Sequence, residues 1–186
     1  MTANRAGTPL KSEAEGIVRK LSLLELLRRY GEARVVGSVA LDLVVKKDID
    51  IHVLTGEHDL FRVVDSVYRA LLEYEDIRDV RISDYRERAG ILVGIDTYPG
   101  DSGNWSIDIW ITDRADTTGF ALVDRLSKEL RPQHREAILE IKRVYYQQGL
   151  LRDSMSNTIY EAVMKAGVQD LAGFQRFLSR QPSGRA

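Results

Sequence analysis

The 186-residue sequence contains no cysteine and only four prolines. The absence of cysteine excludes disulfides, thiolate nucleophiles and zinc sites built on cysteine. The sequence also has no excess of positive or negative charge, because its 27 Lys and Arg nearly balance its 28 Asp and Glu and leave a net charge of −1. No chain-wide positive field is therefore present to hold a phosphate backbone, which argues against nucleic acid as a partner.

Long apolar runs are absent as well. The longest candidate, around residues 21–27, is interrupted by Ser22 and Glu25 and falls short of the roughly 20 residues that span a bilayer. The mixed-charge N-terminus lacks the apolar centre of a signal peptide. We therefore expect no membrane partner and a cytoplasmic location.

The chain does have enough apolar residues for a packed core, at 44% of the total. Strand-like patterns dominate up to about residues 113–116, and helix-like patterns follow. We therefore predict an α/β or α+β fold with a C-terminal helical region. The expected boundaries are residues 12–115 for the core, 116–180 for the helical region, and 1–11 and 181–186 for flexible ends.

Periodicity and turn residues place the individual elements. The first helix is expected to begin at Ser12, which has capping-box spacing to Glu15, and to stop at Gly31. A second helix is expected over residues 59–73. Strands are expected over residues 33–36, 48–53, 77–85, 91–98 and 105–112, and later helices over 117–130, 132–148, 157–166 and 171–178.

Three aspartates occupy alternate positions in two of these predicted strands. Asp48 and Asp50 flank one isoleucine, so strand geometry places both carboxylates on one face with β-carbons roughly 7 Å apart. Adjacent anions repel unless a cation lies between them, so the pair indicates a site for a hard divalent metal. Asp108 has an isoleucine on each side in the later strand and points away from its apolar face.

Gly37 and Ser38 follow a short β-rich run and precede the first aspartate. Glycine lets a backbone approach a phosphate closely, and serine can donate a hydrogen bond to it. A Gly-Ser pair is common by itself, so its meaning depends on the aspartates that follow.

The order hydrophobic-Gly37-Ser38, spacer, Asp48-x-Asp50 and a third strand carboxylate, Asp108, resembles the signature of the polymerase-β-type nucleotidyltransferase superfamily. The resemblance covers about residues 12–112 and implies that superfamily's mixed sheet flanked by helices. The chain is similar to the small, minimal and antibiotic-modifying members. Its short apolar spacer at 39–47 is similar to the GrpB-like branch.

The resemblance also implies roles for individual residues. Three residues would bind the triphosphate: Gly37, Ser38 and Lys47. Three would form the catalytic site and bind Mg²⁺, two ions being expected: Asp48, Asp50 and Asp108. The implied reaction moves a nucleoside monophosphate, AMP from ATP, onto a hydroxyl of a small molecule or a protein, with pyrophosphate leaving.

Two positions depart from the family pattern. Asp42 or Leu41 stands where a second glycine is usual, and Lys47 stands where a serine often precedes the first aspartate. These departures leave open the alternative that the chain is a catalytically weak or inactive regulatory member of the family, such as an antitoxin-like binding protein. An Asp-x-Asp glycosyltransferase is a further alternative, although that class generally needs a larger nucleotide-binding sheet. The oligomeric state is open, with a homodimer as one option.

Several other residues have two interpretations each. His52 shares the face of the aspartates and can contact metal or substrate, or be a partly exposed strand residue. Trp105 is expected in the core, whereas Trp110 can stack on a base or acceptor ring or be partly buried under later helices. A group of arginines interspersed with acids can face a triphosphate or nucleic acid, but is expected instead to form a solvated, ion-paired surface: Arg78, Arg81, Arg86 and Arg88.

Overall fold

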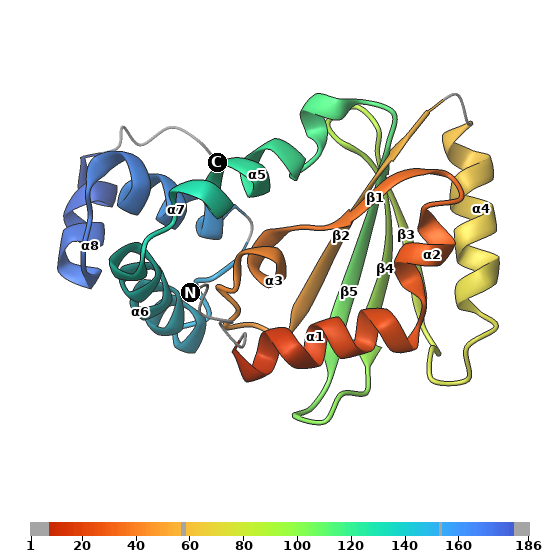
Figure 1. Ribbon diagram of the computed structural model, residues 1–186, viewed down its shortest axis with the longest axis horizontal. Helices are drawn as coiled ribbons and strands as arrows, with labels where there is room; N and C mark the ends of the chain where they lie inside the picture. The colour runs from red at the N-terminus through yellow and green to blue at the C-terminus, as the bar shows by residue number, and fades with distance from the viewer. Residues whose placement is uncertain (1–7, 57–58, 153, 181–186) are drawn as a thin grey trace, which may run out of the picture. The chain divides into compact units, whose positions relative to one another are not determined.

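The computed structural model describes residues 8–56, 59–152 and 154–180 (Figure 1). The chain divides into two compact units, Met1–Arg125 and Leu126–Ala186. Residues 1–7 and 181–186, which the sequence places in flexible ends, lie outside the described residues. The remaining part of the expected N-terminal end is structured, because the first helix begins at Pro9.

The first unit is built on a five-stranded sheet with the order β1-β2-β5-β4-β3. Its strands are β1 (Gly31–Val35), β2 (Asp48–Thr55), β3 (Val80–Tyr85), β4 (Gly90–Tyr98) and β5 (Trp105–Thr112). The central pair β2–β5 is parallel, and the other neighbouring strands are antiparallel. The expected mixed α/β architecture is therefore confirmed.

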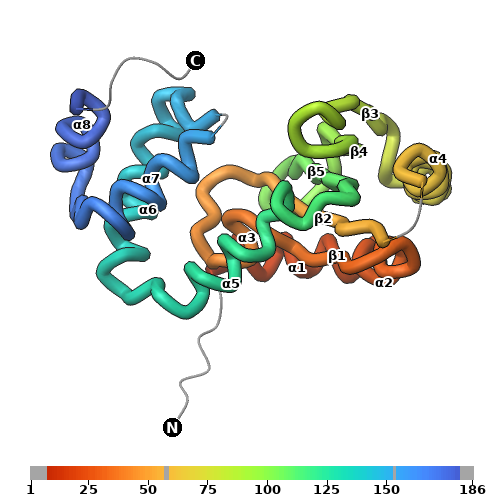
Figure 2. The backbone as a smooth tube through the Cα atoms, turned by 90° about the horizontal axis from the view of Figure 1, so that it is seen from above, coloured from red at the N-terminus to blue at the C-terminus, as the bar shows by residue number. Residues whose placement is uncertain are grey.

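The helices of this unit pack mainly on one face of the sheet (Figure 2). They are α1 (Pro9–Lys20), α2 (Leu23–Leu27), α3 (Gly37–Leu41) and α4 (Leu60–Leu71), followed by the short 3-10 helix η1 (Ala115–Thr117). Apolar residues of α1, α2 and α4 form one core with the inward side chains of β2 and β5. That core leaves the opposite face of the sheet to polar groups.

Strict alternation along the two central strands separates these faces. The inward side chains of β2 and β5 are fully buried: Ile49, Ile51, Val53, Ile107, Ile109 and Ile111. The residues between them are half-buried on the other face, because successive side chains of a strand point to opposite sides. The polar face therefore carries both aspartates of β2 and the aspartate of β5.

The first helix differs from the expectation. It begins at Pro9, where the Thr8 side chain accepts a hydrogen bond from a backbone N–H of the first turn, and it ends at Lys20. Ser22 then adopts a left-handed conformation, with φ of 45°, before α2 begins. The break lets Leu21 and Leu23, which lie on opposite sides of a continuous helix, both become buried.

The second unit is helical. Its helices are α6 (Pro132–Gln147), α7 (Met155–Ala166) and α8 (Leu171–Ser179), preceded by α5 (Phe120–Glu129), which spans the boundary between the units. The fully buried Phe174 ring packs edge-on against Tyr145, with ring centroids 5.2 Å apart. Among the described residues, no helix is both long enough and apolar enough to cross a membrane.

Candidate functional site

The three candidate carboxylates lie on one face of the central strand pair. Asp50 on β2 is the direct register partner of Asp108 on β5. Two residues earlier on the same strands, and therefore on the same face, Asp48 pairs with Ser106. The side chains of Asp48 and Asp108 are 26% and 33% exposed, so solvent and ligands can reach them. The parallel pairing thus brings together three acids that are up to 60 residues apart in the sequence.

Gly37 and Ser38 lie beside this group, at the start of the short helix α3. Gly37 has φ of +61°, in the left-handed region. A β-carbon at this position would lie only 2.5 Å from Oδ2 of Asp50. Both the backbone conformation and the close approach therefore favour glycine. The Ser38 side chain is nearly buried, and the following turn is closed by the Leu43 N–H donating to the Ser38 carbonyl at 2.8 Å.

Asp42 ends α3 in a left-handed conformation, with φ of 56°. The sequence resemblance places the family's second glycine at Leu41 or Asp42, and aspartate is among the few residues other than glycine that tolerate this backbone. Its carboxylate accepts hydrogen bonds from the Thr8 backbone N–H at 3.1 Å and from the Thr8 hydroxyl at 2.8 Å. Asp42 therefore supplies the positive φ of this turn and connects the turn to the start of α1 through two hydrogen bonds.

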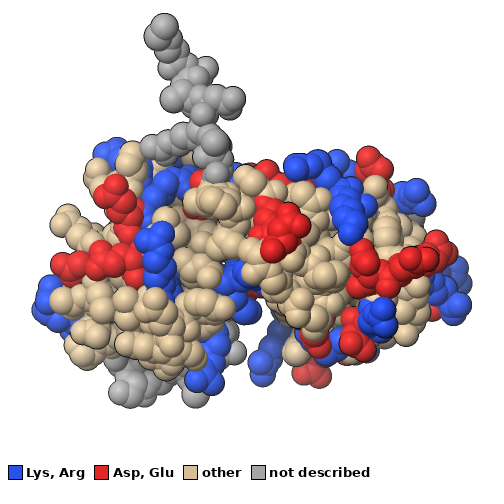
Figure 3. Space-filling view, turned by 90° about the horizontal axis from the view of Figure 1, so that it is seen from below, with Lys and Arg blue, Asp and Glu red and all other residues tan. Residues whose placement is uncertain are grey.

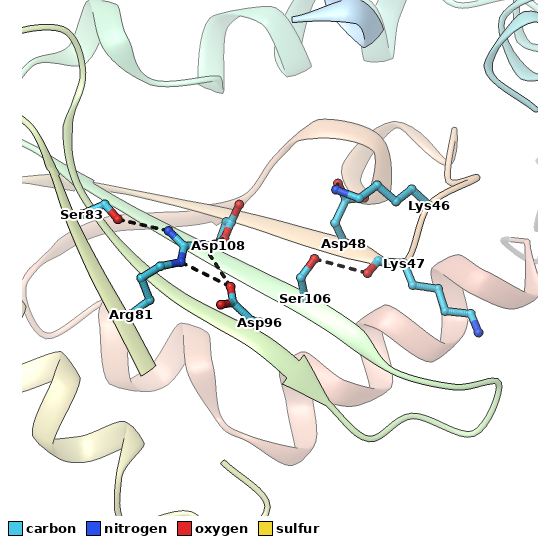
Figure 4. Close-up of polar contacts among 8 residues, drawn as sticks. All are labelled: Lys46, Lys47, Asp48, Arg81, Ser83, Asp96, Ser106 and Asp108. Atoms are coloured by element: carbon cyan, nitrogen blue, oxygen red, sulfur yellow. Dashed lines mark hydrogen bonds and ion pairs between the residues drawn. The ribbon is translucent and has the colours of Figure 1, made fainter. Parts of the chain in front are cut away.

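The structure does not bring the Lys47 amino group to the carboxylates. Its side chain points away from Asp48, and Nζ donates to the carbonyl of Ser102 in the turn between β4 and β5 (Figure 4). The Lys47 carbonyl accepts the backbone N–H of Ser106 at 3.0 Å. Lys47 therefore joins β2 to β5 at the start of their pairing.

Of the two adjacent lysines, both of which the sequence allows to contact phosphates, Lys46 is the one whose amino group lies beside the carboxylates. Its amino group lies 3.1 Å from Oδ2 of Asp48 (Figure 4). Partial burial acts to lower the pKa of Lys46, but the carboxylates of Asp48, Asp108 and Asp50 outweigh it and raise the pKa. Lys46 is therefore a fully charged cation beside the three acids.

A second cation reaches the site from the edge of the sheet. Arg81 on β3 extends over Gly94 of β4, and its Nη2 lies 3.8 Å from Oδ1 of Asp108. The same guanidinium contacts Asp96 at 3.1 Å and Ser83 at 3.2 Å. A β-carbon at Gly94 would lie 2.9 Å from Nη2, so the glycine leaves room for this approach. Arg81 is thus exposed and ion-paired, as the sequence predicts, and its second contact, with Asp108, places it at the edge of the site.

These surroundings affect the acidity of Asp108. Burial raises the pKa of Asp108 above its usual value, the Arg81 guanidinium opposes the rise, and the charge of Asp48 adds to it. A carboxylate with a raised pKa is a better proton acceptor. Asp108 is therefore suited to take a proton from an incoming hydroxyl.

Among the described residues, no three His, Asp or Glu side chains form a ready-made metal cage. Mg²⁺ rarely uses such a cage, since it is usually bound by one or two carboxylates together with substrate phosphates and waters. The donor set fits this ion, because three carboxylates share one half-exposed face. The three acids would therefore supply part of a Mg²⁺ ligand set, and the oxygens of a triphosphate and waters would supply the rest.

Aromatic residues continue the same face beyond the carboxylates. His52 is the register partner of Trp110, and their ring centroids are 6.4 Å apart. The His52 Nδ1 accepts the Gly119 N–H at 3.0 Å, and burial lowers the pKa of His52 to about 4. His52 is therefore a neutral structural residue near neutral pH. Trp105 is fully buried, as expected, whereas Trp110 is half-buried.

No protein-family model matches the sequence, and no curated protein sequence is detectably similar to it. Solved structures do share its fold. A cytoplasmic RNA terminal U-transferase matches with a TM-score of 0.61 and 16% identity over 82% of this chain and 47% of its own. A Cid1 poly(U) polymerase structure matches with a TM-score of 0.63 and 17% identity over 84% of this chain and 48% of its own.

Identity at this level shows the fold alone. The chain shares the mixed-sheet fold of these nucleotidyltransferase structures, so the fold that the sequence resemblance implies is confirmed. The chain spans about half the length of the solved structures that it matches. The activities in their names are those of the matched proteins.

Proposed function

We propose that this chain is a Mg²⁺-dependent nucleotidyltransferase that moves a nucleoside monophosphate from a triphosphate to a hydroxyl group. The supporting observation is the register pairing of Asp50 with Asp108, with Asp48 on the same face and Gly37 against Asp50. Cid1 structures of the same fold contain Mg with 3′-dATP and Mg with GTP. A metal–triphosphate complex is therefore chemistry that this fold accommodates.

Different residues of the site would bind the phosphates and the metal ions. Gly37 leaves room for a phosphate beside Asp50, and Ser38 lies next to it at the start of α3. Lys46 is placed to neutralise phosphate charge. Asp48, Asp50 and Asp108 would hold Mg²⁺, which would supply charge stabilisation for an in-line displacement.

Asp108 has a second role, as the proton acceptor. The acceptor oxygen forms a bond to the α-phosphorus while the bond to the bridging oxygen of pyrophosphate breaks. The hydroxyl proton passes to the Asp108 carboxylate, whose pKa is raised by burial. Arg81 keeps that carboxylate ionised and oriented before the hydroxyl arrives.

For the substrates, we propose ATP as the nucleotide and a small molecule or a protein as the acceptor. A net charge of −1 and the mixture of Lys and Arg with Asp and Glu on the face drawn in Figure 3 support an acceptor other than nucleic acid. The neighbours named for RNA substrates share only the fold at 16–17% identity.

A second candidate function is a regulatory binding protein without catalysis. One observation favours it: Asp48 and Asp108 already have cationic neighbours within the chain, Lys46 and Arg81. Such pairs lower the repulsion that otherwise demands a metal ion. A binding protein of this kind would take up a triphosphate without releasing pyrophosphate.

Pyrophosphate release from each of the four ribonucleoside triphosphates tests the proposal, with Mg²⁺ or with a chelator, over a panel of hydroxyl-bearing small molecules and peptides. We expect Mg²⁺-dependent release, fastest with ATP, that is lost in Asp108→Asn. Asp84→Asn is the matched control, because Asp84 also pairs with an arginine but lies outside the site. No release with any triphosphate would leave the regulatory function as the better account.

A further inference from the structure

We propose that Trp110 and Tyr85 form a stacking surface for a planar ring on the acceptor, so that the acceptor carries an aromatic ring near its reacting hydroxyl. This inference rests on the proposed function, in which Asp108 receives the hydroxyl proton. Trp110 follows Asp108 by two residues on β5, and their side chains share one face. The two positions are about 7 Å apart along the strand, a span that one small molecule can bridge.

The second ring comes from the edge strand. Tyr85, at the end of β3, is 43% exposed. Its ring lies 5.4 Å from that of Trp110, between centroids, with an angle of 39° between the planes. The two rings therefore form one continuous aromatic surface on an otherwise polar face. Aromatic side chains that stay accessible beside a site are suited to stack on planar ligands.

The surface is supported from two sides. Leu92, the β4 register partner of Trp110, is 4% exposed, so the layer next to the tryptophan is packed. On the other side His52 faces Trp110, and a hydrogen bond from Gly119 holds its ring. A surface held in this way needs little ordering when a ring binds.

Topology indicates that the ring belongs to the acceptor and not to the nucleotide. Gly37 follows β1 and lies against Asp50 of β2, whereas Tyr85 lies on β3 at the opposite edge of the sheet. In an in-line displacement the acceptor approaches the α-phosphorus opposite to the departing pyrophosphate. A triphosphate at Gly37 therefore leaves the side of Asp108 that faces Trp110 for the acceptor.

Tryptophan fluorescence tests this surface without metal or triphosphate. Trp105 is fully buried, so dissolved probes report mainly on Trp110. The ring-bearing probes are 4-hydroxybenzyl alcohol and N-acetyltyrosinamide, compared with glycerol and N-acetylserinamide, which carry hydroxyls without a ring; adenosine is left out because it is the nucleoside of the proposed nucleotide. We expect saturable quenching by at least one ring-bearing probe and none by its ringless counterpart. Equal responses, or no response to either ring-bearing probe, would overturn the inference.

The variant Tyr85→Ser should weaken the binding of the ring-bearing probe about tenfold, in line with loss of one stacking partner. Tyr146→Ser is the matched control, because Tyr146 is similarly exposed at 48% but lies on α6. Unchanged affinity in Tyr85→Ser would also contradict the proposal.

Pyrophosphate release separates this inference from the proposed function. Release that depends on Mg²⁺, combined with no ring binding, would refute the stacking surface alone. Ring binding without any release would refute the transferase and leave a binding surface. If both are present, Tyr85→Ser should raise the KM for a ring-bearing acceptor and leave the KM for ATP unchanged.

Discussion

Asp50 and Asp108 are register partners across the parallel pair β2–β5. Neighbouring strands lie about 4.8 Å apart, so the two carboxylates are held close together by the backbone itself. Lys46 and Arg81 approach the flanks of the group and offset part of its charge. The arrangement is a preformed anionic site whose geometry depends on the sheet more than on loops.

The first prediction concerns Gly37. Gly37→Ala should abolish nucleotide binding and cost about 1–2 kcal/mol of folding free energy from the left-handed backbone, with a further cost from the contact with Asp50. Chemical denaturation and nucleotide titration measure both effects. Gly16→Ala is the control: it lies inside α1 with open space around a new β-carbon, and should stabilise the protein by about 0.5–1 kcal/mol. Normal binding by Gly37→Ala would argue against a phosphate site there.

The second prediction concerns pH and His52. Its pKa is lowered to about 4 in the folded protein by burial, against about 6.5 when unfolded. Between these values the unfolded state binds more protons, so stability is lost as the pH falls. Between pH 7.5 and 5 this residue alone should remove about 2 kcal/mol from the free energy of unfolding. In His52→Asn, whose amide oxygen can still accept from Gly119, the decrease should be smaller by that amount; equal decreases would mean that His52 is not the group responsible.

The third prediction concerns the pair Arg81 and Asp108. The guanidinium favours the charged carboxylate and so opposes the effect of burial on the pKa of Asp108. In Arg81→Gln that pKa should rise further, and the acid limb of the rate profile should move to higher pH. Arg86→Gln, which disrupts an exposed pair with Asp84, should leave the profile in place. A shift of the same size in both variants would exclude a specific role for Arg81.

The fourth prediction concerns Asp42. Asp42→Gly should keep the turn and nucleotide binding, because glycine adopts the left-handed conformation readily, although two hydrogen bonds from Thr8 are lost. Asp42→Val should be less stable than Asp42→Gly by about 1–2 kcal/mol, because a β-branched residue is strained at φ of 56°. Urea denaturation of the two variants measures the difference, and equal stabilities would contradict the backbone argument.

Much of the fold could be predicted from local pattern. The alternation of isoleucine with aspartate in β2 and β5 requires only strand geometry, and the positions of Trp105 and Trp110 on opposite faces follow from the same period. The sequence does not predict the break at Ser22, because Leu21, Leu24 and Leu27 fit one face of a continuous helix, and only the burial of Leu23 as well requires the break.

The site could be predicted only in part. The three aspartates were identified, but their register depends on two strands distant in sequence. Lys46 and Lys47 are adjacent, and a shift of one residue reverses the direction of a side chain, so the sequence did not show which one approaches the acids. Arg81 reaches Asp108 only because Gly94, on an intervening strand, lacks a side chain. Such contacts arise from tertiary packing.

The most direct test of the central claim is the thermal stability of the protein with each of four triphosphates, with and without Mg²⁺, for wild type and Asp50→Asn. A ligand that binds only the folded state raises stability by mass action, by about 2.7 kcal/mol at a hundred times its Kd. Asp65→Asn, on α4 and paired with Arg69, is the control. We predict a Mg²⁺-dependent increase in wild type and Asp65→Asn that is absent in Asp50→Asn. An equal increase in Asp50→Asn, or no increase with any triphosphate, would contradict the account.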